Sequence, residues 1–295
     1  MENRVIFTDR CGDLSNDELK HYGLWPEAVN LHLTYNGVDI NPKTDDEFYD
    51  HLIDGSYAPG GLKSSSPSYA DAKKVLDDII ANTPESTEIV YAGTSPFISA
   101  GTANLMRMVL DDYIAAYPNR KFTFVDTLCT SNGQGLDLQY LAAYQGDDIV
   151  SYAHDIGKHI VHLFTQRDFN YSAKSGRYAF SKRIVMLVAS AVHVSPWMYF
   201  PSDDKLQTDS TIRRGDKILH EWVDYYLANR AAPNEPIRIG YGGRTELGRA
   251  EKFIALLEAA GVQPEQIQLT HVGRAIGAHT GHTVLSFFFR QKNER

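Results

Sequence analysis

Two histidines stand in the stretch AIGAHTGHTVLSFFF, residues 275–289. His279 and His282 precede a run of bulky apolar residues that predicts a buried strand. An imidazole at this place can donate a hydrogen bond at the polar entrance of an apolar pocket. The plainer alternative, which is the better expectation for any lone histidine, is a solvated or hydrogen-bonded ring in a loop.

Hydroxyl groups gather at the expected carboxyl ends of several strands. The clusters are Thr8-Asp9, Thr94-Ser95, Asp126-Thr127 and, before a helix, Lys63-Ser64-Ser65-Ser66. Ligands of open parallel sheets bind at this edge, and the N-termini of neighbouring helices favour anions. The pattern predicts hydrogen bonding to a carboxylate or phosphate. Individually, Ser and Thr residues more often serve as helix caps and turns.

Familiar catalytic and cofactor motifs are absent from the sequence. It contains neither a G-x-S-x-G elbow nor a G-x-x-x-x-G-K-[ST] loop. The stretch IGYGGRTELG lacks the third glycine of a dinucleotide fingerprint. A zinc site needs three or four well-placed ligands, and His279-x-x-His282 with His271 nearby is an unspecific pattern. We therefore expect no metal and no cofactor.

Composition narrows the class of protein. The chain has 295 residues with 43% hydrophobic content, enough for two compact units with a cleft. Its net charge of -8 argues against nucleic acid and an anionic membrane surface as partners. Cys11 and Cys129 imply no disulfide framework. Without a signal peptide or a segment of roughly 20 apolar residues, we expect a soluble, cytoplasmic protein.

The elements that would position these residues follow a βα rhythm through about residue 146. Strands are predicted at 4–9, 88–93 and 121–127, and a hairpin turns at Asn36-Gly37 within 28–40. Ser15 with Glu18 forms a capping-box pattern, Thr44 with Glu47 starts another helix, and Ser66-Pro67 predicts a helix over 67–82. The fold class is α/β with a mostly parallel sheet.

A second, smaller α/β domain is predicted from the changed rhythm after this point. We expect helices at 147–158 and 180–191, a strand at 159–164, and antiparallel pairing of HVSPWMYF with KLQTDSTIRR. A helix after Gly215, another ending at Gly261, and the strands IRIGYGG, QIQLTHV and TVLSFFFR complete it. The predicted domains are residues 1–155 and 156–295, with a ligand in and between them.

Several stretches together resemble the DegV family of bacterial fatty-acid-binding proteins, the FakB-like lipid carriers. The resemblance runs in order over nearly the whole chain. The matching stretches are VIFTDRCGDLS, LKSSSPS (like T-S-Q-P-S), TSPFISAGTANL (like S-S-x-L-S-G-T-Y), VDTLCTSNGQGL (like V-D-S…S-x-G-x-G), YSAKSGRY (like K-G-G-R-I), IRRGDKIL (like R-G-x-K-A-L) and IGAHTGHTVLSFFF (like I-G-x-H-x-G-P-G).

The resemblance implies a non-enzymatic carrier whose buried fatty acid is held at its carboxylate by hydroxyls and a histidine. Ser64 stands at the threonine of T-S-Q-P-S and Ser65 at its serine, Arg177 at the G-R arginine, and His279 at the histidine of I-G-x-H. The second hydroxyl is either Ser95 or Ser99, because TSPFISAGT is one residue longer than the family's spacing.

The resemblance also implies a fatty acid kinase that phosphorylates the bound acyl group. Arg177, Arg213 and Arg214 are candidates for contacting it, although each could equally be an ordinary solvated cation. The chain departs from the family where Ser66 replaces glutamine and His282 replaces proline.

Two alternatives stay open from the residues alone. One is a hydrolase in which a serine and His279 act as nucleophile and base. The other is a sensor of a small organic acid or phosphate.

Overall fold

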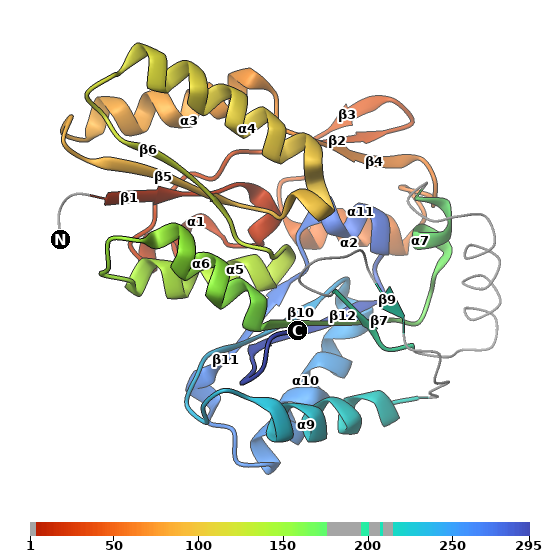
Figure 1. Cartoon of the computed structure of the whole chain (residues 1–295). Coiled ribbons are helices and arrows are strands. Elements are labelled where there is room, and N and C mark those ends of the chain that lie inside the picture. The colour runs from red at the N-terminus through yellow and green to blue at the C-terminus, as the bar shows by residue number, and fades with distance from the viewer. Residues whose placement is uncertain (1–3, 176–195, 201–206, 209–214) are drawn as a thin grey trace. The chain divides into compact units, whose positions relative to one another are not determined.

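The computed structural model describes residues 4–175, 196–200, 207–208 and 215–295 of the chain (Figure 1). Two compact units are present. Unit 1 consists of Met1–His32 and Ser65–Lys158, and unit 2 of Leu33–Ser64 and His159–Arg295. No helix in these described ranges is long and apolar enough to span a membrane.

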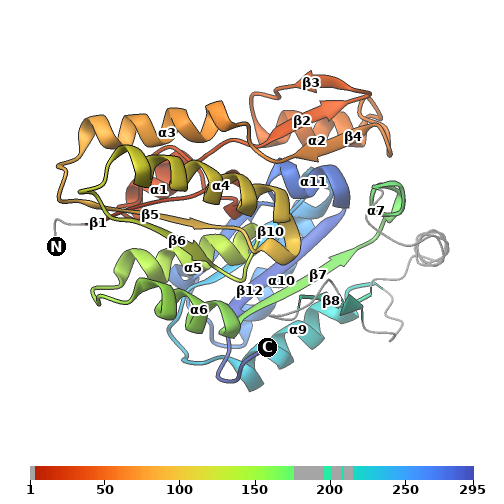
Figure 2. The same ribbon diagram turned by 45° about the horizontal axis from the view of Figure 1, so that its top comes forward.

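Unit 1 is a parallel three-stranded sheet between two layers of helices (Figure 2). Its strands, in the spatial order β1-β5-β6, are β1 (Arg4–Phe7), β5 (Glu88–Gly93) and β6 (Phe122–Asp126). Its helices are η1 (Arg10–Gly12), α1 (Asn16–His21), α3 (Tyr69–Asn82), α4 (Pro96–Ala116), α5 (Ser131–Ala143) and α6 (Ile149–His159). The mostly parallel sheet predicted for the first half is confirmed.

The side chains of these strands point alternately to the two faces of the sheet, and each face has its own hydrophobic core. Phe7, Ile89 and Tyr91 pack against α3 and α4. The intervening side chains, including Ile6 and Val90, pack against α1, α5 and α6. Because successive strand residues point to opposite faces, strands covered on both faces carry apolar residues at consecutive positions, as in Ile89-Val90-Tyr91 of β5.

The start of α3 differs slightly from the prediction. Ser68, rather than Ser66, is the N-cap, and its hydroxyl accepts from the backbone N–H of Asp71. The Asp71 carboxylate accepts from the Ser68 N–H at 2.8 Å, which completes a reciprocal capping box. This pair satisfies two N–H groups that the first turn would otherwise leave unbonded, so the helix begins two residues later.

Unit 2 contains a six-stranded mixed sheet and a separate three-stranded sheet. The first has the order β11-β10-β12-β7-β8-β9, with strands β7 (Ile160–Gln166), β8 (Met198–Tyr199), β9 (Gln207–Thr208), β10 (Ile237–Tyr241), β11 (Ile267–His271) and β12 (Val284–Arg290). The second has the order β3-β2-β4, with strands β2 (His32–Tyr35), β3 (Val38–Ile40) and β4 (Leu62–Ser65).

The helices of unit 2 are α2 (Asp45–Ile53), α7 (Asn170–Lys174), α9 (Lys217–Asn229), α10 (Arg244–Ala259), η2 (Pro264–Gln266) and α11 (Arg274–Thr280). Helices α9 and α10 cover one face of the six-stranded sheet. Trp222, Phe253 and Phe287 are fully buried at the centre of that core. Fully buried aromatic side chains contribute the largest share of burial free energy in such a core.

The hairpin predicted at Asn36-Gly37 is confirmed, since both residues have positive φ and β2 pairs with β3 in antiparallel register. The predicted antiparallel pairing near residues 198 and 207 is also confirmed by β8 and β9. The helix predicted at 180–191 lies outside the described residues.

The two units differ from the predicted domains 1–155 and 156–295. Residues 33–64 belong with the second unit, the later boundary lies after Lys158, and the second unit is the larger of the two and not the smaller. The side chains of residues 33–64 build a small aromatic core with that unit, in which Phe48, Tyr49 and Leu62 pack with Tyr171 and Ala278. The Tyr49 hydroxyl also donates to the Val272 carbonyl at 2.6 Å. Contacts between residues more than a hundred positions apart are invisible to a local pattern, so the sequence showed no boundary here.

Candidate functional site

Ser64 and His279, two of the ligand-binding residues implied by the family resemblance, lie side by side in unit 2. Ser64 Oγ and His279 Nε2 share a hydrogen bond of 2.7 Å. Both residues are half-buried. A hydroxyl and an imidazole this close can both donate hydrogen bonds to one carboxylate. Alternatively, the imidazole can act as a base that takes the proton of the hydroxyl, which then acts as a nucleophile.

Strand β4 positions Ser64. Along this strand Leu62 is buried in the aromatic core, Lys63 is exposed, Ser64 is half-buried and Ser65 is exposed. Alternation along the strand therefore turns Ser64 toward the same side as Leu62, and Ser65 away from it. Ser65, also predicted to bind the ligand, is an exposed residue assigned to unit 1 and is not brought to the pair within unit 2.

Helix α11, which the sequence did not predict, positions His279 ahead of the expected strand TVLSFFFR. The histidine lies in the last turn of this short helix, and β12 begins only at Val284. Gly281 ends the helix with φ +78°, a conformation that residues with a Cβ rarely adopt. A Cβ on Gly281 would also lie 2.6 Å from Cδ2 of Tyr171. This glycine turn separates the histidine from the strand.

Helix α7 and strand β7 fix the backbone beneath the pair. The Ser172 hydroxyl is within hydrogen-bond distance of the His279 carbonyl, at 3.1 Å, and of Gln166 Oε1, at 2.8 Å. The Tyr171 hydroxyl donates to the carbonyls of Leu52 and Tyr57. These bonds tie α11, α7, β7 and the chain around α2 into one polar cluster, which we call the Ser–His site (Ser64, Gln166, Ser172 and His279).

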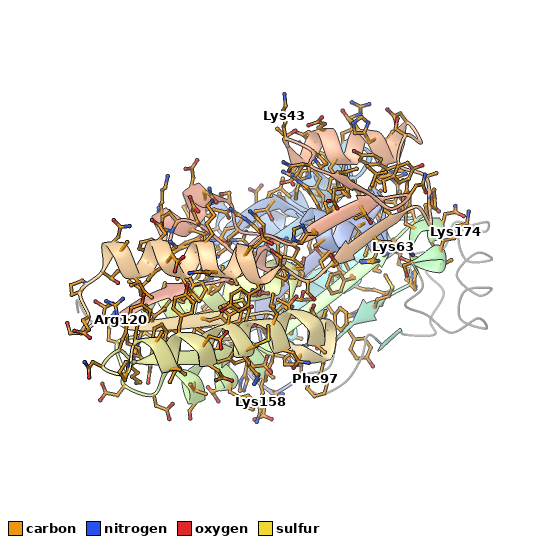
Figure 3. All side chains as sticks on the ribbon, turned by 90° about the horizontal axis from the view of Figure 1, so that it is seen from above. Lys43, Lys63, Phe97, Arg120, Lys158 and Lys174 are labelled. Atoms are coloured by element: carbon orange, nitrogen blue, oxygen red, sulfur yellow. The ribbon has the colours of Figure 1, made fainter. Side chains whose placement is uncertain are left out.

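Two exposed lysines come from the elements that build the Ser–His site. Figure 3 labels Lys63 on β4 and Lys174 at the end of α7. In the described part of the chain no ion pair involves either of them. In a protein of net charge -8, they supply local positive charge of the sign that attracts a carboxylate.

Unit 1 distinguishes between the two serines that the sequence left open. Ser95 is the N-cap of α4, is 1% exposed, and its hydroxyl has no hydrogen-bond partner among the described residues. Ser99 instead interrupts the helix with φ -137° and ψ 75° and shares a hydrogen bond with Thr102 Oγ1 at 2.9 Å. A buried hydroxyl without a partner costs free energy, so Ser95 is the better candidate for a ligand contact.

The three threonines of the predicted crevice form hydrogen bonds inside unit 1. Thr8 Oγ1 accepts from the Gln134 side chain at 2.9 Å, and Thr127 Oγ1 donates to the Gly93 carbonyl at 2.9 Å. The Leu128 N–H donates to Asp126. These bonds fix the loops at the strand ends, which is the capping and turn role weighed above.

Asp9 forms a buried hub that sequence reasoning missed. Its carboxylate accepts from the Tyr91 hydroxyl at 2.5 Å, the Thr94 N–H at 3.1 Å and the Cys11 N–H at 2.8 Å. Burial, followed by the charge of Asp9, raises the pKa of Tyr91 well above its usual value, which keeps this phenol a donor. The hub joins the ends of β1 and β5, and the Thr8-Asp9 pair carried no signal separating this role from ligand binding.

In the described part of the chain, His271 and His282 do not form a metal centre with His279. His282 Nδ1 lies 3.2 Å from Thr245 Oγ1, while His271 contacts Tyr241 and the Gly242 carbonyl. Among the residues described, no group of three or more His, Cys, Asp or Glu side chains could hold a metal ion. Burial lowers the pKa of His282, so the residue that replaces the family's proline is favoured in its neutral form.

The glycine-rich loop IGYGGRT is filled by protein atoms. A Cβ on Gly242 would lie 2.7 Å from the His282 carbonyl oxygen, and one on Gly243 would lie 2.8 Å from Ile53 Cδ1. These glycines permit close backbone packing rather than approach of a pyrophosphate. Arg177, Arg213 and Arg214, the predicted cationic contacts, lie outside the described residues.

The fold and the site together define a two-unit α/β protein with a polar Ser–His site and, in unit 1, a buried hydroxyl at Ser95 that has no hydrogen-bond partner among the described residues. The profile of the DegV family, a family described as uncharacterised, matches residues 4–292, and the chain belongs to the DegV family. A curated relative, the DegV domain-containing protein CPE0026 of Clostridium perfringens, is 23% identical over 305 residues that cover 98% of each chain.

Solved structures share the fold over the whole chain. A fatty-acid-binding DegV family protein from Thermus thermophilus has a TM-score of 0.78 and 18% identity, with 98% of this chain and 99% of that chain covered. A DegV family protein from Eubacterium eligens loaded with heptadecanoic acid has a TM-score of 0.79 and 16% identity, with 98% and 100% covered. The two-domain α/β fold class predicted from the sequence is confirmed.

Proposed function

We propose that this protein is a carrier that binds a long-chain fatty acid and holds its carboxylate at Ser64 and His279. The observation that carries the proposal is the 2.7 Å contact between Ser64 Oγ and His279 Nε2. These residues stand 215 positions apart, and each was expected to be a head-group ligand from an independent stretch of sequence. The ligands bound by the Thermus and Eubacterium proteins support the same class of ligand.

Two contributions to the binding free energy of such an acid oppose each other: burial of the acyl chain and desolvation of the carboxylate. Removing the chain from water contributes about 0.8 kcal/mol for each buried CH₂. Burying the carboxylate is costly unless hydrogen bonds replace its hydration. Charge-assisted bonds from a hydroxyl and an imidazolium are short and strong enough to offset that cost. In unit 1, the unpartnered hydroxyl of Ser95 is a further candidate donor, to be tested separately.

The finer part of the proposal is presentation of the bound acid to a fatty acid kinase. A carboxylate oxygen of the ligand would attack the terminal phosphorus of a nucleoside triphosphate on the kinase, and the diphosphate would leave. The products are an acyl phosphate and a nucleoside diphosphate. In this scheme the carrier positions the carboxylate and the kinase supplies the chemistry.

The test is native mass spectrometry of the purified protein, followed by organic extraction of the released molecule. We expect one long-chain acid per chain. Both proposed donors replace hydrogen bonds that the carboxylate loses when it leaves water. Ser64→Ala and His279→Ala should therefore each lose most of the retained acid. The matched control is His220→Ala, at an exposed histidine on α9, which should retain it. An empty protein that also fails to take up added fatty acid would refute the proposal.

The same contact favours one second candidate, a hydrolase with Ser64 as nucleophile and His279 as base. Such an enzyme should turn over activated esters, and Ser64→Ala should abolish the turnover. Absence of turnover across a panel of ester chain lengths would remove this candidate without affecting the carrier proposal.

A further inference from the structure

His162 is a buried imidazole in unit 2. It lies on β7 with 1% exposure, and neither ring nitrogen has a hydrogen-bond partner in the described part of the chain. A buried polar group left unpaired destabilises the folded state, so most such groups in native proteins are bonded. An exception in a strand of the central sheet calls for a physical reason.

The surroundings of His162 are aromatic. Its ring centroid lies 5.3 Å from that of Phe288 and 6.2 Å from that of Phe200. Phe164 makes edge-to-face contacts with the same two phenylalanines, at 5.4 Å and 5.5 Å. No carboxylate or carbonyl from this cluster compensates the ring nitrogens, although the rings pack well in their edge-to-face geometry.

Strand geometry relates His162 to the Ser–His site. Residues at every second position of a strand share one face, so His162, Phe164 and Gln166 lie along the same side of β7. The opposite face carries Leu163, which packs in the core under α9 and α10. Gln166 belongs to the Ser–His site through its bond with Ser172. His162 therefore lies on the face that leads from that site, four residues back along the strand.

The separation matches the middle of a long acyl chain. Four residues of a strand span roughly 13 Å. An extended chain of single bonds advances roughly 1.2 Å per bond. An acid whose carboxylate lies level with Gln166 would therefore have about ten or eleven bonds between that carboxylate and His162. A chain lying along β7 would pass the aromatic cluster and bring its middle carbons to the imidazole.

We propose that this carrier selects long-chain acids with a hydroxyl or keto oxygen near the middle of the chain, which His162 recognises by a hydrogen bond. The inference rests on the proposed fatty acid binding. An imidazole ring carries both a donor and an acceptor, so it can bond either a hydroxyl or a carbonyl. The ligand group would supply a hydrogen-bond partner that no described residue supplies to His162.

The experiment compares two acids on delipidated full-length protein by calorimetry. The probes are octadecanoic acid and 12-hydroxyoctadecanoic acid, with the hydroxyl at the position the strand spacing indicates. We expect the hydroxy acid to bind about tenfold more tightly, a ratio equivalent to about 1.4 kcal/mol. As a positional control, 2-hydroxyoctadecanoic acid should show no such gain, because its hydroxyl would lie beside the carboxylate.

Variants assign the preference to the imidazole. In His162→Leu the affinity ratio of the two acids should fall to about one, whereas His162→Gln, which keeps a donor and an acceptor, should retain part of it. His220→Leu, at an exposed histidine in the same unit, should leave the ratio unchanged. Thermal unfolding of each variant without ligand checks that the variant is folded. If His162→Leu does not fold, the comparison of His162→Gln with the native protein is decisive.

The outcomes separate the two proposals. Equal affinity for the two acids in the native protein, or an unchanged ratio in both His162 variants, would overturn the recognition of an oxygenated chain while leaving fatty acid binding in place. Failure of every acid to bind would overturn the proposed function and this inference together.

Discussion

At the scale of residues, the protein separates hydroxyls and imidazoles that stabilise from those available to a ligand. The Asp9 carboxylate accepts a hydrogen bond from the Cys11 N–H, and the hydroxyls of Thr8 and Thr127 form hydrogen bonds within unit 1. Ser95 and His162 are buried and have no hydrogen-bond partner in the described ranges. Hydrogen-bond satisfaction, which depends on the folded environment, decides which polar side chain can accept a new partner.

His162 should make stability depend on pH. Burial, and secondarily Arg295, lowers its pKa well below the usual value. Below about pH 6.5 the unfolded chain then takes up a proton that the native state refuses, so the free energy of unfolding falls with falling pH by up to about 1.4 kcal/mol per pH unit. The loss begins near the unfolded pKa and continues down to the folded one.

Urea unfolding at pH 7.5 and pH 5.5 measures this effect. His162→Leu cannot bind that proton, so it should lose less stability over this interval than the native protein, by about 1 kcal/mol or more. His220→Leu serves as the control and should follow the native protein. The explanation fails if His162→Leu shows the native pH dependence.

The residues of the candidate site were more predictable than their roles. Ser64 and His279 could be named because their local motifs resemble those of a family, and they do lie together. The bonded state of Thr8, Thr127 and Asp9 could not be foreseen, because a Ser or Thr at a strand end has the same local sequence in both roles. His162 gave no signal at all, since its isolation depends on Phe164, Phe200 and Phe288.

At the scale of elements, helix α11 shows where local pattern reading failed. The apolar run of β12 was predicted, but the turn of helix before it was not. That helix is only seven residues long, too short to be stable alone. Its stability comes from packing, because Gly277 and Gly281 approach Tyr49 and Tyr171 more closely than any side chain would permit.

Gly281→Ala should therefore weaken the Ser–His site. The alanine would have to adopt φ +78° and place its Cβ against the Tyr171 ring, which is itself anchored through its hydroxyl. We expect a loss of about 1–3 kcal/mol in the free energy of unfolding, together with weaker fatty acid retention, since His279 lies two residues away.

Gly248→Ala is the matched control for this change. Gly248 lies within α10, and a Cβ there would meet nothing within 4 Å. Replacing an exposed glycine inside a helix should stabilise the protein by about 0.5–1 kcal/mol. Denaturant unfolding and native mass spectrometry of both variants measure the contrast. Equal stability of the two variants would contradict the role assigned to Gly281.

At the scale of the whole molecule, the division into units follows packing and not chain order. Arg274 forms an ion pair with Asp45 at 2.6 Å, and Arg244 forms one with Asp50 at 3.1 Å. Such exposed pairs contribute little on their own, so the aromatic core around Phe48 and Tyr49 must supply most of the attachment. The βα rhythm correctly gave the strands β1, β5 and β6, yet it contained no information about which elements share a core.

Hydrogen exchange should reveal this assignment. Backbone amides of α2 (Asp45–Ile53) should lose protection together with those of α11 under increasing denaturant, because both belong to the same core. Mass spectrometry of peptic fragments measures the midpoints for each segment. Loss of protection in α2 together with α3 and α4 of unit 1, at a midpoint distinct from α11, would contradict the assignment of residues 33–64 to unit 2.

The early position of residues 33–64 has a consequence during synthesis on the ribosome. Phe48 and Tyr49 emerge long before Tyr171 and Ala278, the later residues of their core. At about 5–20 residues per second, the interval until Ala278 is made lasts on the order of ten to forty seconds. Throughout that time Phe48 and Tyr49 cannot pack into their complete hydrophobic core, because Ala278 has not yet been synthesised. The nascent chain is thus exposed to chaperones and proteases for most of its translation, and the second unit can mature only when nearly all of the polypeptide exists.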